Sequence, residues 1–153
     1  MSVKEQQINK LRRLSQKYAY TSIQMHETIG RKAGLSGTDH KYLGFIIQKG
    51  QMTAGELAIL TGLTTGAVTS LIDRFEQKGL VKRELDKNDR RKIIIIPNTK
   101  KITSILEPLY REFQNDTENL MASFTSEELK FLETYFKKYL KLMDDTINNL
   151  NKT

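Results

Sequence analysis

The spacing of apolar and polar residues predicts long amphipathic helices at both ends of the chain. Apolar residues recur every three or four positions over 5–32, over roughly 98–122, and from the capping box "TSEE" at 125–128 to near the C-terminus. A stripe this narrow and this long usually packs on another helix. It is buried either against its own chain or against a second copy. We favour a dimer, because one small domain offers few partners for three long helices.

Shorter helices are predicted between these ends. The first begins after the break at 34–37, where Ser36 or Thr38 can cap it, and runs to about Gln48. The second begins at "TAGE", 53–56, which is another capping box because a threonine is followed three residues later by a glutamate. The segment between them reads as a turn with one short strand.

A third short helix follows the second after a tight turn. Gly62 in "TGLT" permits that turn, Thr64 can cap the next helix, and this helix should end near Lys78 and Gly79. Two short helices joined by a tight turn with a glycine match the helix-turn-helix pattern.

A β-hairpin is predicted directly after the second helix of this pair. "LVKREL" at 80–85 and "KIIIIP" at 92–97 are rich in β-branched residues and flank a polar turn, and Pro97 should end the second strand. Four consecutive isoleucines suggest cover on both faces of that strand. They would anchor the hairpin and project Arg90 and Arg91 outward, so the whole segment describes a winged helix. The fold class predicted is mainly α with a small β-hairpin wing.

The two faces of the 64–78 helix differ in a way that suits DNA. At about 100° per residue, its large apolar residues fall on one side, and the opposite side is small and polar. A major groove admits such a face, and arginine suits a narrow minor groove. The alternatives are a solvated helix face and a solubilising turn. The residues predicted to contact DNA are Thr53, Thr64, Thr65, Gly66, Thr69, Ser70, Arg74, Lys87, Arg90, Arg91 and Lys92.

Asp73 is the exception on this face, because a carboxylate repels phosphate. We expect it to form an ion pair with an arginine of the hairpin, Arg90 or more particularly Arg91, and so to hold the wing against the helix. The alternative is a solvent-exposed aspartate that contributes little to stability.

Charge narrows the choice of partner. The net charge is +7, but residues 1–52 hold nine bases and three acids, whereas residues 102–153 hold six bases and nine acids. An anionic partner is therefore expected away from the C-terminal end. The absence of cysteine excludes disulfides and thiolate metal sites. No run approaches the roughly 20 apolar residues of a membrane span, and no signal-peptide core is visible, so a cytoplasmic soluble protein is expected.

The sequence gives little support for the alternatives that this protein is an enzyme or a metal sensor. The chain has two histidines and contains no glycine-rich phosphate loop, nucleophile elbow or histidine-glutamate zinc motif, so no enzyme, cofactor or metal is predicted. Two alternatives stay open. One is a metal-responsive regulator in which His26, His40 and Asp39 meet, although zinc prefers three or four good ligands. The other is a winged helix that binds protein or RNA.

One stretch resembles a known family. "MTAGELAILTGLTTGAVTSLIDRFEQKGLVKRELDKNDRRKIII" is similar to the DNA-binding core of the MarR (multiple antibiotic resistance regulator) family of bacterial transcription factors. The family's "D-x-x-D-R-R" wing is present as Asp86, Asp89, Arg90 and Arg91. Three departures are Asp39 with His40 in place of a common "Q-F", 97–101 in place of "L-T-x-x-G", and the absence of cysteine, which excludes the thiol peroxide sensors of one branch.

The resemblance covers nearly the whole chain and implies how it works. It implies a single chain of 1–153 in which 1–34 and 100–153 are dimerisation helices and 36–99 is the winged helix-turn-helix lobe. The homodimer would be triangular and would bind a palindromic operator in double-stranded DNA. Such regulators usually repress, and many release DNA when a small aromatic or anionic effector binds. The residues expected to line the effector pocket are Met25, His26, His40, Tyr42 and Phe45; the alternative is that they are ordinary core and surface residues.

Overall fold

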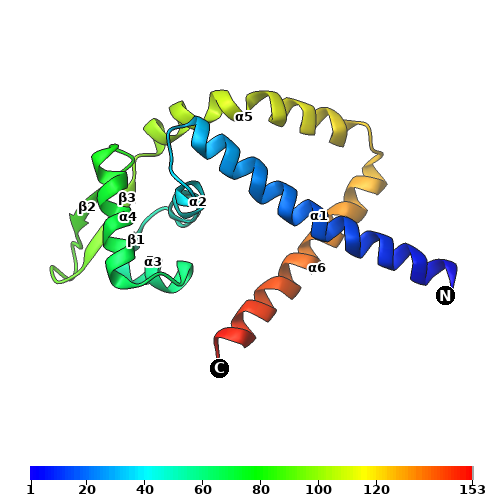
Figure 1. The fold of residues 1–153 in the computed structure, drawn as a ribbon, viewed down its shortest axis with the longest axis horizontal. Helices are drawn as coiled ribbons and strands as arrows, with labels where there is room; N and C mark the ends of the chain where they lie inside the picture. Colours follow the sequence, from blue (N-terminus) through cyan, green and yellow to red (C-terminus); the bar gives the residue numbers. More distant parts are fainter. Residues whose placement is uncertain (153) are drawn as a thin grey trace. The chain divides into compact units, whose positions relative to one another are not determined.

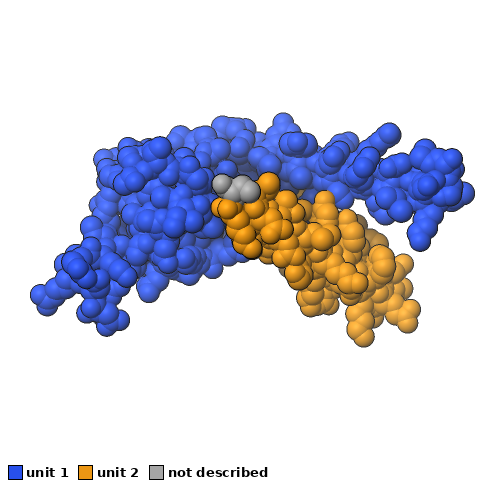
Figure 2. All heavy atoms as spheres, turned by 90° about the horizontal axis from the view of Figure 1, so that it is seen from below, with its two compact units in different colours: residues 1–110 blue, residues 111–153 orange. Residues whose placement is uncertain are grey.

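The computed structural model describes residues 1–152 and divides the chain into two compact units, Met1–Tyr110 and Arg111–Thr153 (Figure 2). The described residues are mainly helical with one small antiparallel sheet, as the sequence predicts. The elements are α1 (Val3–Lys32), α2 (Asp39–Lys49), β1 (Met52–Thr53), α3 (Ala54–Thr61), α4 (Thr65–Gln77), β2 (Val81–Leu85), β3 (Ile93–Pro97), α5 (Thr99–Ala122) and α6 (Ser126–Asn151) (Figure 1). Helix α5 crosses from the first unit into the second.

Side-chain caps fix where most helices begin. The predicted capping boxes open α3 at Thr53 and α6 at Thr125, and a third box at Ser2 opens α1. Thr64 caps α4 by accepting from the backbone N–H of Ala67 at 3.2 Å. The predicted cap of α2 was wrong. The N-cap residue Thr38 makes no side-chain cap bond there, and the Ser36 hydroxyl donates to a carboxylate instead.

The helix-turn-helix is confirmed in its geometry. Helices α3 and α4 meet at a bend of 112°, within the range of about 90–120° for this motif. Gly62 ends α3 with φ 70°, a left-handed conformation that favours glycine, and its N–H donates to the carbonyl of Ala58 at 2.9 Å.

The wing is part of a three-stranded sheet in the order β1-β3-β2. The predicted hairpin is present, with Arg83 opposite Ile95, and β1 pairs on the other edge of β3, with Met52 opposite Ile95. This central position explains the isoleucine run, although cover is uneven: Ile95 is fully buried and Ile93 is exposed. Pro97 is the last residue of β3, opposite Val81, and does not lie beyond the strand.

The core of the first unit packs against the apolar side of α4. The predicted apolar side of α4 is buried, and it packs with residues of α2, α3, the sheet and the start of α5. The buried apolar residues are Leu35, Leu43, Ile46, Met52, Leu57, Val68, Leu71, Ile72, Phe75, Leu80, Val81, Ile95 and Ile102. This core fixes the opposite face of α4 toward the outside.

The long helices at the chain ends contribute little to a core within one chain. Helix α1 exposes Ile8, Leu11 and Tyr18, and α6 contains no buried residue at all. Among the described residues, no single helix meets the length and apolar content of a membrane span, and one bent pair, α3 with α4, meets them when its two helices are counted together.

Candidate nucleic-acid interface

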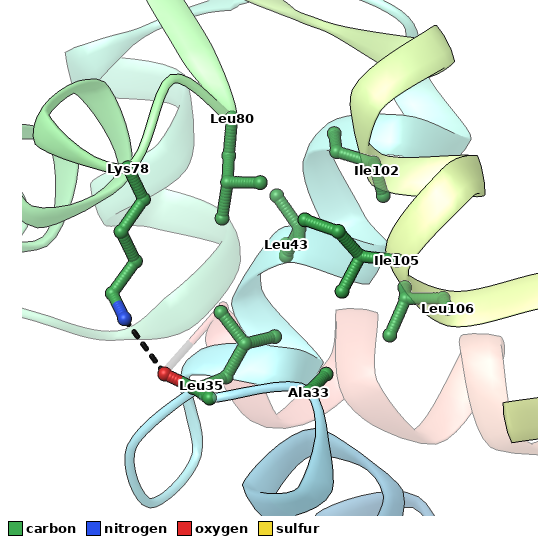
Figure 3. A pocket seen from close by; sticks show the side chains of 9 residues that line it. Ala33, Leu35, Leu43, Lys78, Leu80, Ile102, Ile105 and Leu106 are labelled. Carbon is green, nitrogen blue, oxygen red and sulfur yellow. Dashed lines mark hydrogen bonds between the residues drawn. The ribbon is translucent and has the colours of Figure 1, made fainter.

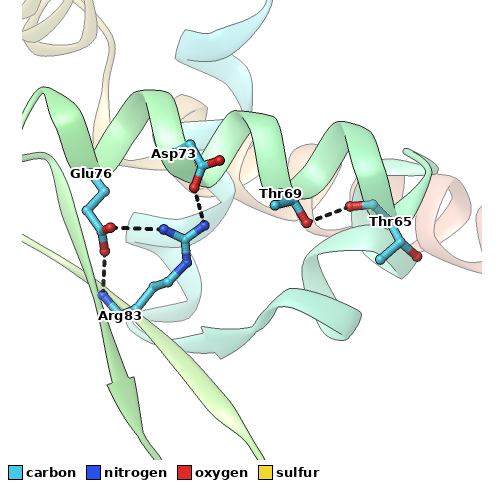
Figure 4. Close-up of polar contacts among 5 residues, drawn as sticks. All are labelled: Thr65, Thr69, Asp73, Glu76 and Arg83. Carbon is cyan, nitrogen blue, oxygen red and sulfur yellow. Dashed lines mark hydrogen bonds and ion pairs between the residues drawn. The ribbon is translucent and has the colours of Figure 1, made fainter.

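The outer face of α4 presents short polar side chains. Thr65, Gly66, Thr69 and Ser70 are all exposed on the side opposite the core. The Thr69 hydroxyl donates to the backbone carbonyl of Thr65 at 3.0 Å (Figure 4). This bond fixes the rotamer of Thr69 and leaves the lone pairs of its oxygen free to accept, so the helix offers defined groups of the kind that recognise base edges.

The turn of the wing is shaped by its own two aspartates. Asp86 accepts from the N–H of Asn88 at 2.8 Å, and Asp89 accepts from both the N–H and Nε of Arg91 at 3.1 Å. These bonds to Arg91 lower the pKa of the Asp89 carboxyl, so it stays ionised. The side chain of Arg91 is nevertheless 91% exposed, and Arg90 is exposed beside it. The turn is therefore ordered by carboxylates and presents its arginines to solvent.

Arg83, a residue of strand β2, joins the wing to α4. Its guanidinium donates to Asp73 at 2.5 Å and to Glu76 at 2.9 Å, and its backbone N–H donates to Glu76 at 3.1 Å (Figure 4). The hydrogen bond to Asp73 is the main cause that raises the pKa of Arg83. We call these three residues the clamp. Two carboxylates on the exposed side of the helix are thereby neutralised in part by one cation.

The expected ion pair between Asp73 and the hairpin is present, but the predicted arginine was wrong: Asp73 pairs with Arg83 and with neither Arg91 nor Arg90. The physical reason is where each arginine lies relative to Asp73. Asp73 and Glu76 lie one helical turn apart beside the rigid strand that carries Arg83, whereas Arg91 lies at the tip of the turn and is held by Asp89. The sequence signal for the clamp was the i, i+3 spacing of the two acids.

Arg74, predicted to contact DNA, has a partner within the protein. Its Nε and Nη2 donate to the two carboxylate oxygens of Asp39 at 3.1 and 2.9 Å, and Ser36 donates to the same carboxylate at 3.1 Å. Asp39 is 4% exposed, while the Arg74 side chain keeps 45% of its surface exposed. The bond to Asp39 raises the pKa of Arg74. Arg74 thus ties α4 to the start of α2, and a contact to DNA from its exposed part stays a prediction.

Removing the charge of Asp39 should destabilise the protein. Asp39→Asn leaves Arg74 with a weaker partner, and hydrogen bonds between charged groups contribute about 1.5–3 kcal/mol. We expect the free energy of unfolding, measured in urea at one protein concentration, to fall by about that amount. Glu84→Gln is the control, because Glu84 pairs with Lys82 on the surface and exposed pairs contribute little. Equal losses in both variants would show that burial of the pair is not the cause.

The two histidines lie together with a tyrosine that the sequence did not single out. His26 Nδ1 lies 2.5 Å from the Tyr110 hydroxyl, and that hydroxyl lies 3.0 Å from His40 Nε2. Asp39 is not part of this group, because its carboxylate is engaged by Arg74. Within residues 1–152, no group of three or more histidine, cysteine, aspartate or glutamate side chains could hold a metal ion.

A cavity of about 240 Å³ lies elsewhere in the first unit (Figure 3). Its lining is apolar except for Lys78, whose Nζ donates to the carbonyl of Gly34 at 2.6 Å. It is lined by Ala33, Gly34, Leu35, Leu43, Lys78, Leu80, Ile102, Ile105 and Leu106. None of the five residues predicted for an effector pocket, namely Met25, His26, His40, Tyr42 and Phe45, lines it. On α2 it is Leu43 that faces this space.

Comparisons with known proteins agree with this geometry. A family model described as "MarR family" matches residues 33–92. The uncharacterized HTH-type transcriptional regulator YcgE of Bacillus subtilis (strain 168) is 36% identical over 139 residues, which span 91% of this chain and 90% of that protein.

Solved structures give the same result for the fold. A MarR family protein from Bacillus stearothermophilus is similar with a TM-score of 0.72 and 26% identity, over 94% of this chain and 99% of that one. A mutant of E. coli MarR complexed with operator DNA is similar with a TM-score of 0.56 and 25% identity, over 88% of this chain and 96% of that one.

Proposed function

This chain belongs to the MarR family of transcriptional regulators, and we propose that two copies of it bind one inverted repeat in double-stranded DNA. Helix α4 of each copy enters a major groove, and the wing of the same copy lies along the adjacent minor groove. The protein is a regulator and not an enzyme. A place in the cytoplasm, where chromosomal DNA is found in bacteria, stays a prediction.

One observation carries the proposal: a polar helix face and an arginine-bearing turn belong to one lobe and are joined directly by the clamp. Thr69 and Ser70 are exposed on α4, and Arg90 and Arg91 are exposed on the turn. Arg83 bonds to two residues of α4 from within the wing. Because phosphate contacts position a protein and base contacts give specificity, this lobe offers both kinds of contact.

The exposed apolar residues of the end helices support a homodimer. On α1 these residues follow helical spacing, and on α6 the same holds for Phe136, Tyr139 and Met143. Apolar surface of this extent, left open in one chain, is typical of a protein–protein interface. A second copy of the chain supplies matching apolar faces on the same helices.

Selection of bound sequences from random duplex DNA tests this function. We expect an inverted repeat whose half-site centres lie about 34–36 Å apart along the helix axis, because two-fold symmetric readers of this type need that spacing. Thr69→Ala and Ser70→Ala should change the selected bases. Enrichment of RNA over duplex DNA in a parallel gel-shift experiment would favour the alternative of an RNA-binding winged helix.

Repression is the regulatory outcome that the family resemblance implies. A reporter gene placed behind the selected sequence should be expressed less when the protein is supplied. Higher expression would assign the protein to the activators.

We also propose that a small aromatic or anionic effector releases the DNA, and the cavity beside Lys78 supports this. An apolar cavity of about 150 Å³ binds benzene, so about 240 Å³ accommodates one substituted ring. Lys78 at its edge supplies a cation for an anionic substituent. Benzoate should therefore raise the midpoint of thermal unfolding of the wild type.

A variant that fills the cavity locates the effector site. Ile105→Trp places a larger side chain in the lining, whereas Ile59→Trp changes a residue that is 85% exposed and serves as the control. Benzoate should stabilise the control and not Ile105→Trp. Equal stabilisation of both would place the ligand elsewhere, and the predicted group of Met25, His26, His40, Tyr42 and Phe45 would then be the next site to test.

A further inference from the structure

Three helices of the first unit meet at one tyrosine hydroxyl. His26 lies on α1, His40 on α2 and Tyr110 on α5, and Tyr110 is within hydrogen-bond distance of a ring nitrogen of each histidine. The two imidazoles are stacked, with ring centroids 5.7 Å apart and an interplanar angle of 22°. We call these residues the His-Tyr-His cluster.

The approach of α1 to α2 at this cluster depends on Gly30. A Cβ added at Gly30 would lie 2.7 Å from the Cβ of His40, which is closer than real side chains allow. The buried glycine therefore lets the ring of His40 come close to α1. The contact between His40 and α1 is therefore part of the packing of α1 against α2.

The number of protons that the cluster accommodates follows from its donors and acceptors. Burial raises the pKa of Tyr110, so its hydroxyl keeps one proton and can donate to one imidazole while it accepts from the other. Two neutral imidazoles satisfy both contacts, and so does one neutral and one charged imidazole. Two charged imidazoles do not, because both then donate to the same oxygen and the hydroxyl proton loses its acceptor. They would also place two positive charges on stacked rings.

In the first unit, the charged residues within three positions of a cluster residue in the sequence are Glu27 on α1, Asp39 and Lys41 on α2, and Glu107 on α5. Asp39 is bound to Arg74, and Lys41 lies over the ring of Tyr42. Burial, and then the neighbouring His26, lower the pKa of His40. His40 is thus more difficult to protonate in the folded chain than in the unfolded one.

We infer that the His-Tyr-His cluster is a proton-operated latch, which joins α2 to α1 and α5 with at most one added proton and opens when both imidazoles are charged. The inference concerns the fold of this chain and does not need the proposed function. If that function also holds, opening frees α2, an element of the DNA-binding lobe, from helices that we assign to the dimer. Operator affinity should then fall in acid.

The latch fixes the sign of the pH dependence of stability. A histidine whose pKa is lowered on folding contributes stability that is fully present above its unfolded pKa of about 6.5 and is lost as the pH falls below it. The midpoint of thermal unfolding should accordingly be lower at about pH 5.5 than at about pH 7.5. The non-titrating variant His40→Gln should lose most of this difference.

Tyr110→Phe removes only the hydroxyl, and Tyr20→Phe is the matched control because Tyr20 is 75% exposed. Each variant is compared with itself at the two pH values, so a general loss of stability does not obscure the result. The control should keep the wild-type difference, and Tyr110→Phe should change it. A wild type that shows no difference, or a difference that persists in His40→Gln, overturns the latch.

NMR titration of the full-length wild type gives a second measurement that needs no variant. The chain has only these two histidines, so both imidazoles can be followed separately. We expect the midpoint of His40 to lie below its unfolded value of about 6.5, and the Tyr110 ring signals to change once both imidazoles are charged. A His40 midpoint that is not lowered, with unchanged Tyr110 signals, would also overturn the latch. Loss of DNA binding at every pH, with the titration intact, would instead refute only the proposed function.

Discussion

Affinity for the selected operator should fall about 10³–10⁵-fold when the salt concentration rises from about 50 to about 200 mM, the change expected for roughly 6–10 phosphate contacts. The wing supplies part of this number from each copy through Lys87, Arg90, Arg91 and Lys92, all of which are exposed. Each phosphate neutralised releases bound counterions, so the logarithm of affinity falls linearly with the logarithm of salt. Fluorescence anisotropy of a labelled duplex over this salt range measures the slope.

The slope should depend on the wing and not on the total charge of the chain. Removing one phosphate contact lowers the slope by about one per copy, so Lys87→Ala should flatten the response. Lys138→Ala removes the same charge from α6, where the chain is acidic overall, and should leave the slope as it was. A wild-type affinity that hardly changes with salt would contradict an interface built on wing cations.

Arg90→Ala should weaken binding to all sequences by about 1–3 kcal/mol for each copy, or roughly 5–150-fold per half-site. Arg90 is exposed at a turn whose shape is set by Asp86 and Asp89, so the truncation removes a contact to the groove without disturbing the turn. The thermal unfolding midpoint should therefore match that of the wild type. Anisotropy titrations on the operator and on an unrelated duplex give the two affinities.

In the same assay, Arg83→Gln distinguishes a residue that contacts DNA from a residue that positions the wing against α4. Arg83 bonds to Asp73 and Glu76 and is not expected to reach DNA, so its loss removes the side-chain link between the wing and α4 and leaves two carboxylates without their cation. In Arg83→Gln, discrimination between operator and unrelated DNA should decrease. In Arg90→Ala, binding to both kinds of DNA should weaken. Normal affinity in Arg90→Ala would remove the wing from the mechanism.

The elements of the lobe could be predicted because their signals are local. The capping boxes at Thr53 and Thr125, the cap at Thr64 and the turn at Gly62 each involve residues within four positions of one another, and the structure contains all of them. The buried side of α4 also follows from helical spacing alone. Such features depend little on which distant segment packs against them.

Contacts between distant segments could not be predicted in the same way. The sequence indicated that Asp73 needs a cation, but the choice of Arg83 over Arg91 depends on where β2 lies beside α4. In the same way, Tyr110 lies 84 residues from His26, and the spacing of the stripe on α5 does not indicate which of its residues faces α1. The apolar cavity beside Lys78 is lined by residues of four separate segments, so no local sequence motif indicates it. Arg74 is the instructive case, because its position on the outer flank of α4 suggested DNA while a buried carboxylate was its partner.

Analytical ultracentrifugation of the full chain, alone and with the selected duplex, tests most directly whether two lobes act together on one DNA molecule. The account predicts a dimer in the absence of DNA and a complex of two chains per duplex, with a duplex carrying one half-site bound far more weakly. A monomer that binds a single half-site as tightly as the full repeat would contradict it.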